Sequence, residues 1–155
     1  MLSGHSQDIK YVKWHPTKNI LFSASYDDTI KCWMYDENID DWNLQYTIEG
    51  HQSTVWSLDF DRTGEFLVSS GEDKRWYVWR VSEQGFENKG VVPDSHRRAI
   101  YSCSWSKAVV PGSSPAQYMD FIATAGADNM ICIFEINRDS FFKPGSGTLE
   151  FNIIS

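Results

Sequence analysis

The sequence predicts an all-β protein built from three four-stranded antiparallel sheets. Three observations support this: short runs of alternating apolar and polar residues, turn-forming residues between the runs, and a set of landmark residues that recurs three times. Aromatic residues make up 15% of the 155 residues, and the chain has seven tryptophans. Such a composition indicates large side chains packed on sheets rather than a disordered chain.

The recurring landmarks are a histidine, a small hydroxyl residue, an aspartate and an aromatic residue. The histidines lie 46 and then 45 residues apart, and the hydroxyl residue and the aspartate stand ten and six residues before the aromatic residue. The landmarks are His5, Ser23, Asp27 and Trp33, then His51, Ser69, Asp73 and Trp79, and finally His96, Thr124, Asp128 and Phe134. Four short strands in each period of about 40–45 residues are typical of a β-propeller blade.

Each repeat is expected to supply four strands. They are expected at 9–14, 20–25, 29–35 and 42–48, at 55–60, 66–70, 75–81 and 86–92, and at 100–105, 121–125, 130–136 and 148–153. The predicted repeats are 1–49, 50–94 and 95–155. The third carries an inserted loop at 107–118 and a second loop at 138–147, both rich in Pro, Gly and Ser. Surface insertions are usually tolerated, so we expect neither loop to carry function.

Within each repeat the four landmarks can form a hydrogen-bond chain. The histidine bonds to the aspartate and the hydroxyl residue, and the indole N–H donates to the hydroxyl, so a loop is fastened to the sheet with its polar groups satisfied. Phe134 has no N–H, so the third chain is expected to end at Thr124. We therefore interpret these residues as a structural network.

The Gly-His start of the repeats and the spaced Ser/Thr, Asp and Trp residues resemble the WD40 family. The resemblance implies a WD40 β-propeller fragment, three blades of a seven-bladed parent. Segments 5–10, 14–16, 25–29, 40–42 and 50–57 are further similar to the WD40 subunits of the cytosolic iron–sulfur protein assembly (CIA) targeting complex.

The narrower resemblance implies a non-enzymatic protein–protein interaction scaffold that delivers clusters to apoproteins. Its partners would be iron–sulfur assembly factors and apoprotein clients, in the cytoplasm or also the nucleus. Three blades cannot close a ring, and their outer faces would be apolar, so self-association of the chain is also expected. A WD40 scaffold of another multiprotein complex is the alternative.

Composition and motifs argue against several other functions. The net charge of −7 does not favour nucleic acid or anionic membranes, and the chain shows no secretory signal or membrane-spanning segment. Cys32, Cys103 and Cys132 are isolated in strand-like runs, which predicts neither disulfides nor a cluster-binding set, and no cofactor is expected.

Two chemical alternatives remain for the repeated residues. A Ser/His/Asp set such as Ser69, His51 and Asp73 could serve a hydrolase, but a catalytic set is not expected to recur in successive repeats. The histidines of different repeats could hold a metal, but none has a partner ligand nearby in sequence, so no metal is expected.

In WD40 propellers partners usually dock on the narrower top face. By the resemblance, this face is reached by the residues three and five after the repeat histidine and by the residue before the turn aspartate. Those positions hold Asp8, Lys10 and Tyr26, then Thr54, Trp56 and Glu72, and finally Ala99, Tyr101 and Ala127.

Two of these positions are expected to contribute most to binding. Trp56 and Tyr101 are residue types that become binding hot spots, and Lys10 suits an acidic group or a C-terminal carboxylate of a partner. The alternative is that the two aromatic residues only pack between neighbouring strands at the mouth of the channel.

Overall fold

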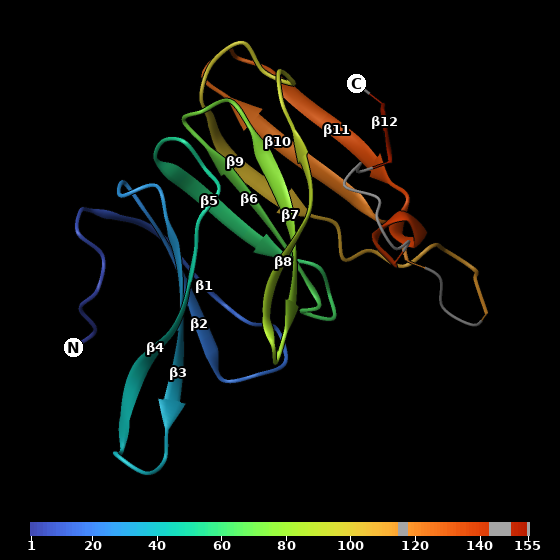
Figure 1. Cartoon of the computed structure of the whole chain (residues 1–155). Coiled ribbons are helices and arrows are strands. Elements are labelled where there is room, and N and C mark those ends of the chain that lie inside the picture. The colour runs from blue at the N-terminus through green and yellow to red at the C-terminus, as the bar shows by residue number, and fades with distance from the viewer. Residues whose placement is uncertain (115–117, 143–149, 155) are drawn as a thin grey trace.

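The computed structural model describes residues 1–114, 118–142 and 150–154, and within them the chain forms twelve strands and one short 3₁₀ helix (Figure 1). The strands of the first sheet are β1 (Ile9–Trp14), β2 (Ile20–Ser25), β3 (Ile30–Asp36) and β4 (Asp41–Ile48). The second sheet contains β5 (Val55–Phe60), β6 (Phe66–Gly71), β7 (Trp76–Ser82) and β8 (Gly85–Val92). The third contains β9 (Ile100–Trp105), β10 (Phe121–Gly126), β11 (Ile131–Ile136) and β12 (Phe151–Ile153).

Each sheet is ordered as its strands follow one another in the chain, and all neighbouring strands are antiparallel. The all-β class and the three four-stranded sheets are therefore confirmed. We call the sheets blades one, two and three. Figure 1 shows them side by side in chain order, with β5 of blade two next to both β1 and β9.

Tight turns join the second and third strands of every blade. Asp28, Lys74 and Asn129 occupy equivalent positions in these turns and have positive φ angles of 68°, 64° and 66°. Asp and Asn tolerate this left-handed conformation better than most residues, whereas Lys74 adopts it without that advantage. The turn geometry therefore repeats even where the residue type does not.

The prediction of an irregular loop at 138–147 was partly wrong. Segment 138–147 contains the 3₁₀ helix η1 (Arg138–Phe142), which begins after Asn137. The Asn137 side chain accepts a hydrogen bond from the backbone N–H of Asp139, and its carbonyl accepts one from Ser140 N–H. The expected last strand at 148–153 is seen as β12, and residues 148 and 149 lie outside the described residues.

The hydrophobic core lies between the blades. Phe22 of blade one packs against Phe60 of blade two with ring centroids 5.0 Å apart. Between blades two and three, Trp76 packs against Phe134 at 4.8 Å, and Phe66 against Phe141 at 4.6 Å. Blade two thus supplies a wall to each of two cores, one shared with blade one and the other with blade three, as expected for stacked repeats.

A buried aspartate connects all three blades. Asp59 of β5 is only 4% exposed, and its carboxylate lies 3.0 Å from Nζ of both Lys13 and Lys107. It also accepts the backbone N–H of Trp105 at 2.9 Å. Burial alone would raise the pKa of Asp59, but this N–H and the two ammonium groups hold it below its usual value.

Candidate protein-binding surface

The landmark residues form what we call the repeat network, present in every blade. In blade one, His5 Nδ1 lies 2.8 Å from the Asp27 carboxylate, and His5 Nε2 lies 2.7 Å from Ser23 Oγ. Trp33 Nε1–H donates to the same hydroxyl at 2.8 Å. Because a carboxylate can only accept, Nδ1 carries the imidazole proton and Nε2 accepts from the serine.

Blade two repeats these bonds. His51 lies 3.0 Å from Asp73 and 2.8 Å from Ser69, and Trp79 Nε1–H donates to Ser69 at 2.9 Å. The aspartate also accepts the backbone N–H groups of Gln52 and Arg75. The network thus fastens the loop before β5 and the turn before β7 to the middle of the sheet.

In blade three the network has one member fewer. His96 lies 3.0 Å from Asp128 and 2.8 Å from Thr124, and the place of the tryptophan is taken by Phe134. The hydrogen bond from His96 lowers the pKa of Asp128 to about 2 against the opposing effect of its burial. The bonds are those expected from the residue types.

The geometry of the network does not suit nucleophilic catalysis. Ser69 is fully buried, and its hydroxyl is shared between an imidazole and an indole N–H. A substrate carbonyl has no approach to such an oxygen, and the same arrangement occurs at Ser23 in blade one.

No group of three or more His, Cys, Asp or Glu that could hold a metal ion occurs among the described residues. Cys32 and Cys103 are buried, and burial raises the pKa of each thiol to about 12. These thiols therefore remain protonated and behave as apolar core groups. In the part of the chain that the structure describes, no helix is long and apolar enough to cross a membrane.

Four of the residues expected at the top face meet in one surface. Lys10 Nζ lies 5.4 Å from the ring centre of Tyr26 and 5.6 Å from that of Trp56, so one ammonium bridges blades one and two. Trp56 in turn meets Tyr101 of blade three edge to face, with ring centres 5.5 Å apart. We call Tyr26, Lys10, Trp56 and Tyr101 the aromatic strip.

Acidic side chains flank the aromatic strip. Glu72 accepts a hydrogen bond from Trp56 Nε1 at 2.8 Å, and Asp8 accepts one from Lys10 at 3.1 Å. Tyr26 and Tyr101 are 50% and 52% exposed. These hydrogen bonds hold Lys10 and Trp56 in the middle of the strip, and the tyrosines at its two ends stay half exposed.

Two of the nine positions taken from the resemblance are buried. Thr54 is 3% exposed and Ala99 5%, and their carbonyls accept backbone bonds from Glu72 and Ala127. Their side chains do not reach the surface, whereas Asp8, the equivalent residue of blade one, makes the same backbone bond with Tyr26 and is exposed.

Sequence reasoning missed a cationic niche beside Tyr101. It lies between blades two and three, has a volume of about 190 Å³, and is lined partly by Lys74, Arg97 and Arg98. Arg98 donates to the carbonyl of Ala127. The pair Arg97–Arg98 directly after His96 was the available signal, but its position against Lys74 depends on how the blades pack.

A family model described as WD domain, G-beta repeat matches residues 1–34 and 42–80. The chain contains WD40 repeats. It is 38% identical over 133 residues, 84% of this chain and 38% of the relative, to a probable cytosolic iron-sulfur protein assembly protein CIAO1 homolog of Ixodes scapularis. A probable cytosolic iron-sulfur protein assembly protein 1 of Vanderwaltozyma polyspora is 37% identical over 92% of this chain and 53% of its own length.

Another WD40-type relative has a different description. Eukaryotic translation initiation factor 3 subunit I of Mycosarcoma maydis is 35% identical over 90% of the chain and 36% of the relative. The chain thus spans about a third to about half of the length of these three relatives. The relatives thus carry two different descriptions.

Proposed function

We propose that the chain is part of a WD40 scaffold for cytosolic iron–sulfur protein assembly and that it binds partner proteins through the aromatic strip. The relatives named for this assembly supply the process, and their names also support a cytosolic location. The observation that supports binding is the strip itself: two half-exposed tyrosines joined through Lys10 and Trp56 across three blades.

The chemistry of the strip favours a peptide with apolar and acidic groups. Exposed aromatic faces bury apolar side chains at little entropic cost, and the ammonium of Lys10 attracts a carboxylate. Iron–sulfur assembly factors and apoproteins are the proposed partners. The competing proposal, a scaffold for translation initiation, is supported by the relatives named initiation factor 3 subunit I.

A pull-down from cytosolic extract with the full chain separates the two. We expect recovery of iron–sulfur assembly proteins, and recovery of initiation factor 3 subunits in their place would overturn the proposal. Trp56→Ala is expected to reduce recovery about tenfold, as for loss of a hot spot. Trp42→Ala, which removes another part-exposed tryptophan from outer strand β4, is the matched control and should leave recovery unchanged.

Self-association remains a prediction. Val12 and Trp14 of β1 are 57% and 52% exposed, whereas the equivalent Leu58 and Phe60 of β5 are covered by blade one. A second copy of the chain could cover this face with its blade three, where Ile131 is 67% exposed. Sedimentation of the wild type and of Trp14→Ser tests this, and a monomer at all concentrations would contradict it.

A further inference from the structure

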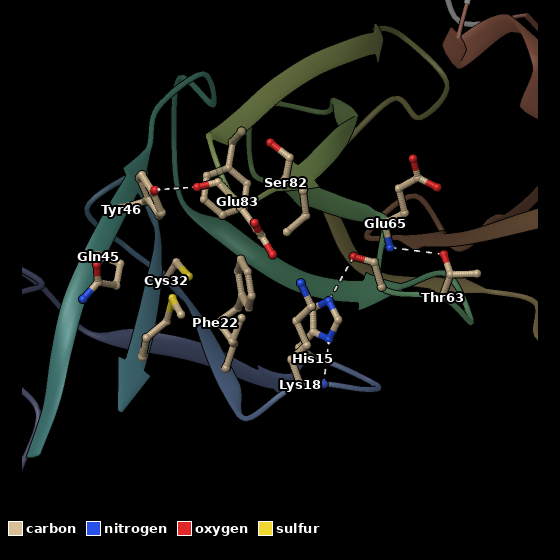
Figure 2. A pocket seen from close by; sticks show the side chains of 15 residues that line it. His15, Lys18, Phe22, Cys32, Gln45, Tyr46, Thr63, Glu65, Ser82 and Glu83 are labelled. Carbon is tan, nitrogen blue, oxygen red and sulfur yellow. Dashed lines mark hydrogen bonds between the residues drawn. The ribbon is translucent and has the colours of Figure 1, made fainter. Parts of the chain in front are cut away.

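A groove of about 730 Å³ lies between blades one and two and is lined from β2, β3 and β4 of blade one and from β7 and β8 of blade two (Figure 2). Its floor is apolar and includes Phe22 and Cys32 of blade one, and its far wall is formed by Val81 and Phe86 of blade two. Ile20 and Met34 also line it and stay partly exposed. We call it the one–two groove, and it lies outside the aromatic strip.

The corresponding space between blades two and three is filled by the chain itself. There Phe141 of η1 is 2% exposed and packs on Phe66, the residue of β6 that corresponds to Ile20 of β2. Phe142 also meets Phe66, at 5.7 Å. The segment that supplies these rings is the long connection between β11 and β12.

Blade two has no such segment. Only Glu83 and Gln84 separate β7 from β8, so no residue of this turn can reach back over Ile20 as Phe141 reaches over Phe66. The turn is instead held near blade one by a hydrogen bond from Tyr46 Oη to the carbonyl of Glu83, seen in Figure 2. The one–two groove therefore has both of its walls but no counterpart of Phe141, the aromatic side chain that fills the groove between blades two and three.

The lower end of the groove is rigid. His15 is 7% exposed, donates from Nε2 to the carbonyl of Gly64 and accepts two backbone N–H groups at Nδ1. Gly64 has a φ of 80°, and a Cβ there would lie 2.2 Å from the imidazole. The two blades are therefore in direct contact and hydrogen-bonded at this end of the groove.

Charge at the rim indicates what would flank an inserted ring. In the filled groove, Arg138 stands three residues before Phe141 and pairs with Asp61 of blade two at 2.6 Å. In the one–two groove, His15 stands at the position of Asp61, and Lys18 lines the same end. The exposed carboxylate of Glu83 lies in the turn after β7 and has no partner among the described residues, and the chain has a net charge of −7. A basic residue beside the inserted aromatic one would pair with Glu83.

We propose that the one–two groove is a docking site for a partner segment that inserts a bulky aromatic side chain flanked by a basic residue. Phe141 of the chain itself is the template for the inserted ring, and the carboxylate of Glu83 is the reason for the basic residue beside it. The inserted ring would contact Ile20 and Phe86, and the cation would pair with Glu83. This site is independent of the proposed function of the aromatic strip.

The test is fluorescence polarisation with the full chain and a labelled, end-capped peptide that copies residues 137–142 with the change Asp139→Lys. We expect saturable binding and at least tenfold weaker binding when both phenylalanines of the peptide are replaced by alanine. Ile20→Trp, which fills the groove, should weaken binding at least tenfold, and Ile39→Trp in an exposed turn should not. Glu83→Lys should weaken it about threefold at low salt.

Equal binding by Ile20→Trp with an unchanged melting midpoint would overturn the proposal, because the peptide would then occupy another site. If Ile20→Trp melts at a lower temperature than the wild type, Val81→Trp is used instead, because it blocks the opposite wall of the groove. Undiminished peptide binding by Val81→Trp with an unchanged melting midpoint would likewise overturn the proposal. If Glu83→Lys binds the peptide as tightly as the wild type at low salt, the assigned charge pair is overturned. A dimer of the chain that Ile20→Trp abolishes would assign the groove to a second copy.

Trp56→Ala should leave peptide binding unchanged. Failure of the groove proposal can therefore be distinguished from failure of the proposed binding by the aromatic strip.

Discussion

In blade two the indole of Trp79 donates a hydrogen bond to Ser69, whereas in blade three Phe134 stands in its place and has no hydrogen to donate. Phe134 is nevertheless the better buried, fully enclosed between Trp76 at 4.8 Å and Phe151 at 5.5 Å. The comparison teaches that packing, rather than the indole hydrogen bond, is the indispensable role of this position.

The same comparison explains a second difference. The repeat histidine follows Gly50 in blade two but Ser95 in blade three. A Cβ on Gly50 would lie 2.6 Å from the six-membered ring of Trp79, and Gly4 meets Trp33 in the same way at 2.9 Å. A phenylalanine lacks that outer ring, so a side chain at the preceding loop position is tolerated in blade three.

The largest effect is expected from Phe134→Ala. Removal of a fully buried aromatic ring should lower the free energy of unfolding by about 3–5 kcal/mol. Urea denaturation measures this, with Ile39→Ala at an exposed site as the control, expected within about 0.5 kcal/mol of wild type. A loss below about 1 kcal/mol would mean that packing is not the role of this position.

Ser69→Ala and Thr124→Val should separate the two networks. Ser69→Ala leaves the Trp79 N–H and a nitrogen of His51 without partners, which should cost about 1–3 kcal/mol. Thr124→Val deprives only His96, so we expect about half that loss. Chemical denaturation of both variants gives the comparison, and a larger loss for Thr124→Val would contradict it.

A double-mutant cycle tests the link between the loop residue and the ring. Gly50→Ser should cost about 1–3 kcal/mol, because the new Cβ overlaps the indole of Trp79. Trp79→Phe alone should cost about 1–2 kcal/mol through its lost hydrogen bond and smaller ring. The double variant should be more stable than the sum of the two predicts, and strict additivity would refute the link.

The smallest effect concerns pH and should be shared by all three blades. Burial raises the pKa values of Asp27 and Asp73 and is the largest single effect on them, but the hydrogen bonds of the networks together hold both below their usual value, and they do the same for Asp128. A depressed carboxyl pKa gives stability that is complete above about pH 4 and is lost as pH falls through the folded-state value, about 2 for Asp128. Thermal melts between pH 5 and pH 2 should show this decline, and Asp128→Asn should flatten it.

Most of the strand pattern and the repeat networks could be predicted from the sequence because both are set by short spacings within one repeat. Thr54 shows a limit of predicting top-face residues by their position in the repeat. The residue lies at the expected position, but its side chain is buried. The loop at 138–147 shows a second limit. Pro and Gly marked it as irregular, but the burial of Phe141 depends on a wall supplied by Phe66 of another blade.

By itself, the sequence determined the three repeats, the antiparallel strands and the hydrogen-bond partners of each repeat histidine. Only the tertiary structure decided what lies between repeats: the buried Asp59 with its two lysines, the meeting of Lys10 with Trp56, and the difference between the filled and the open groove. The physical reason is distance along the chain. Strand alternation and turn chemistry act over a few residues, whereas contacts between blades join residues about 45 positions apart and depend on how whole sheets pack.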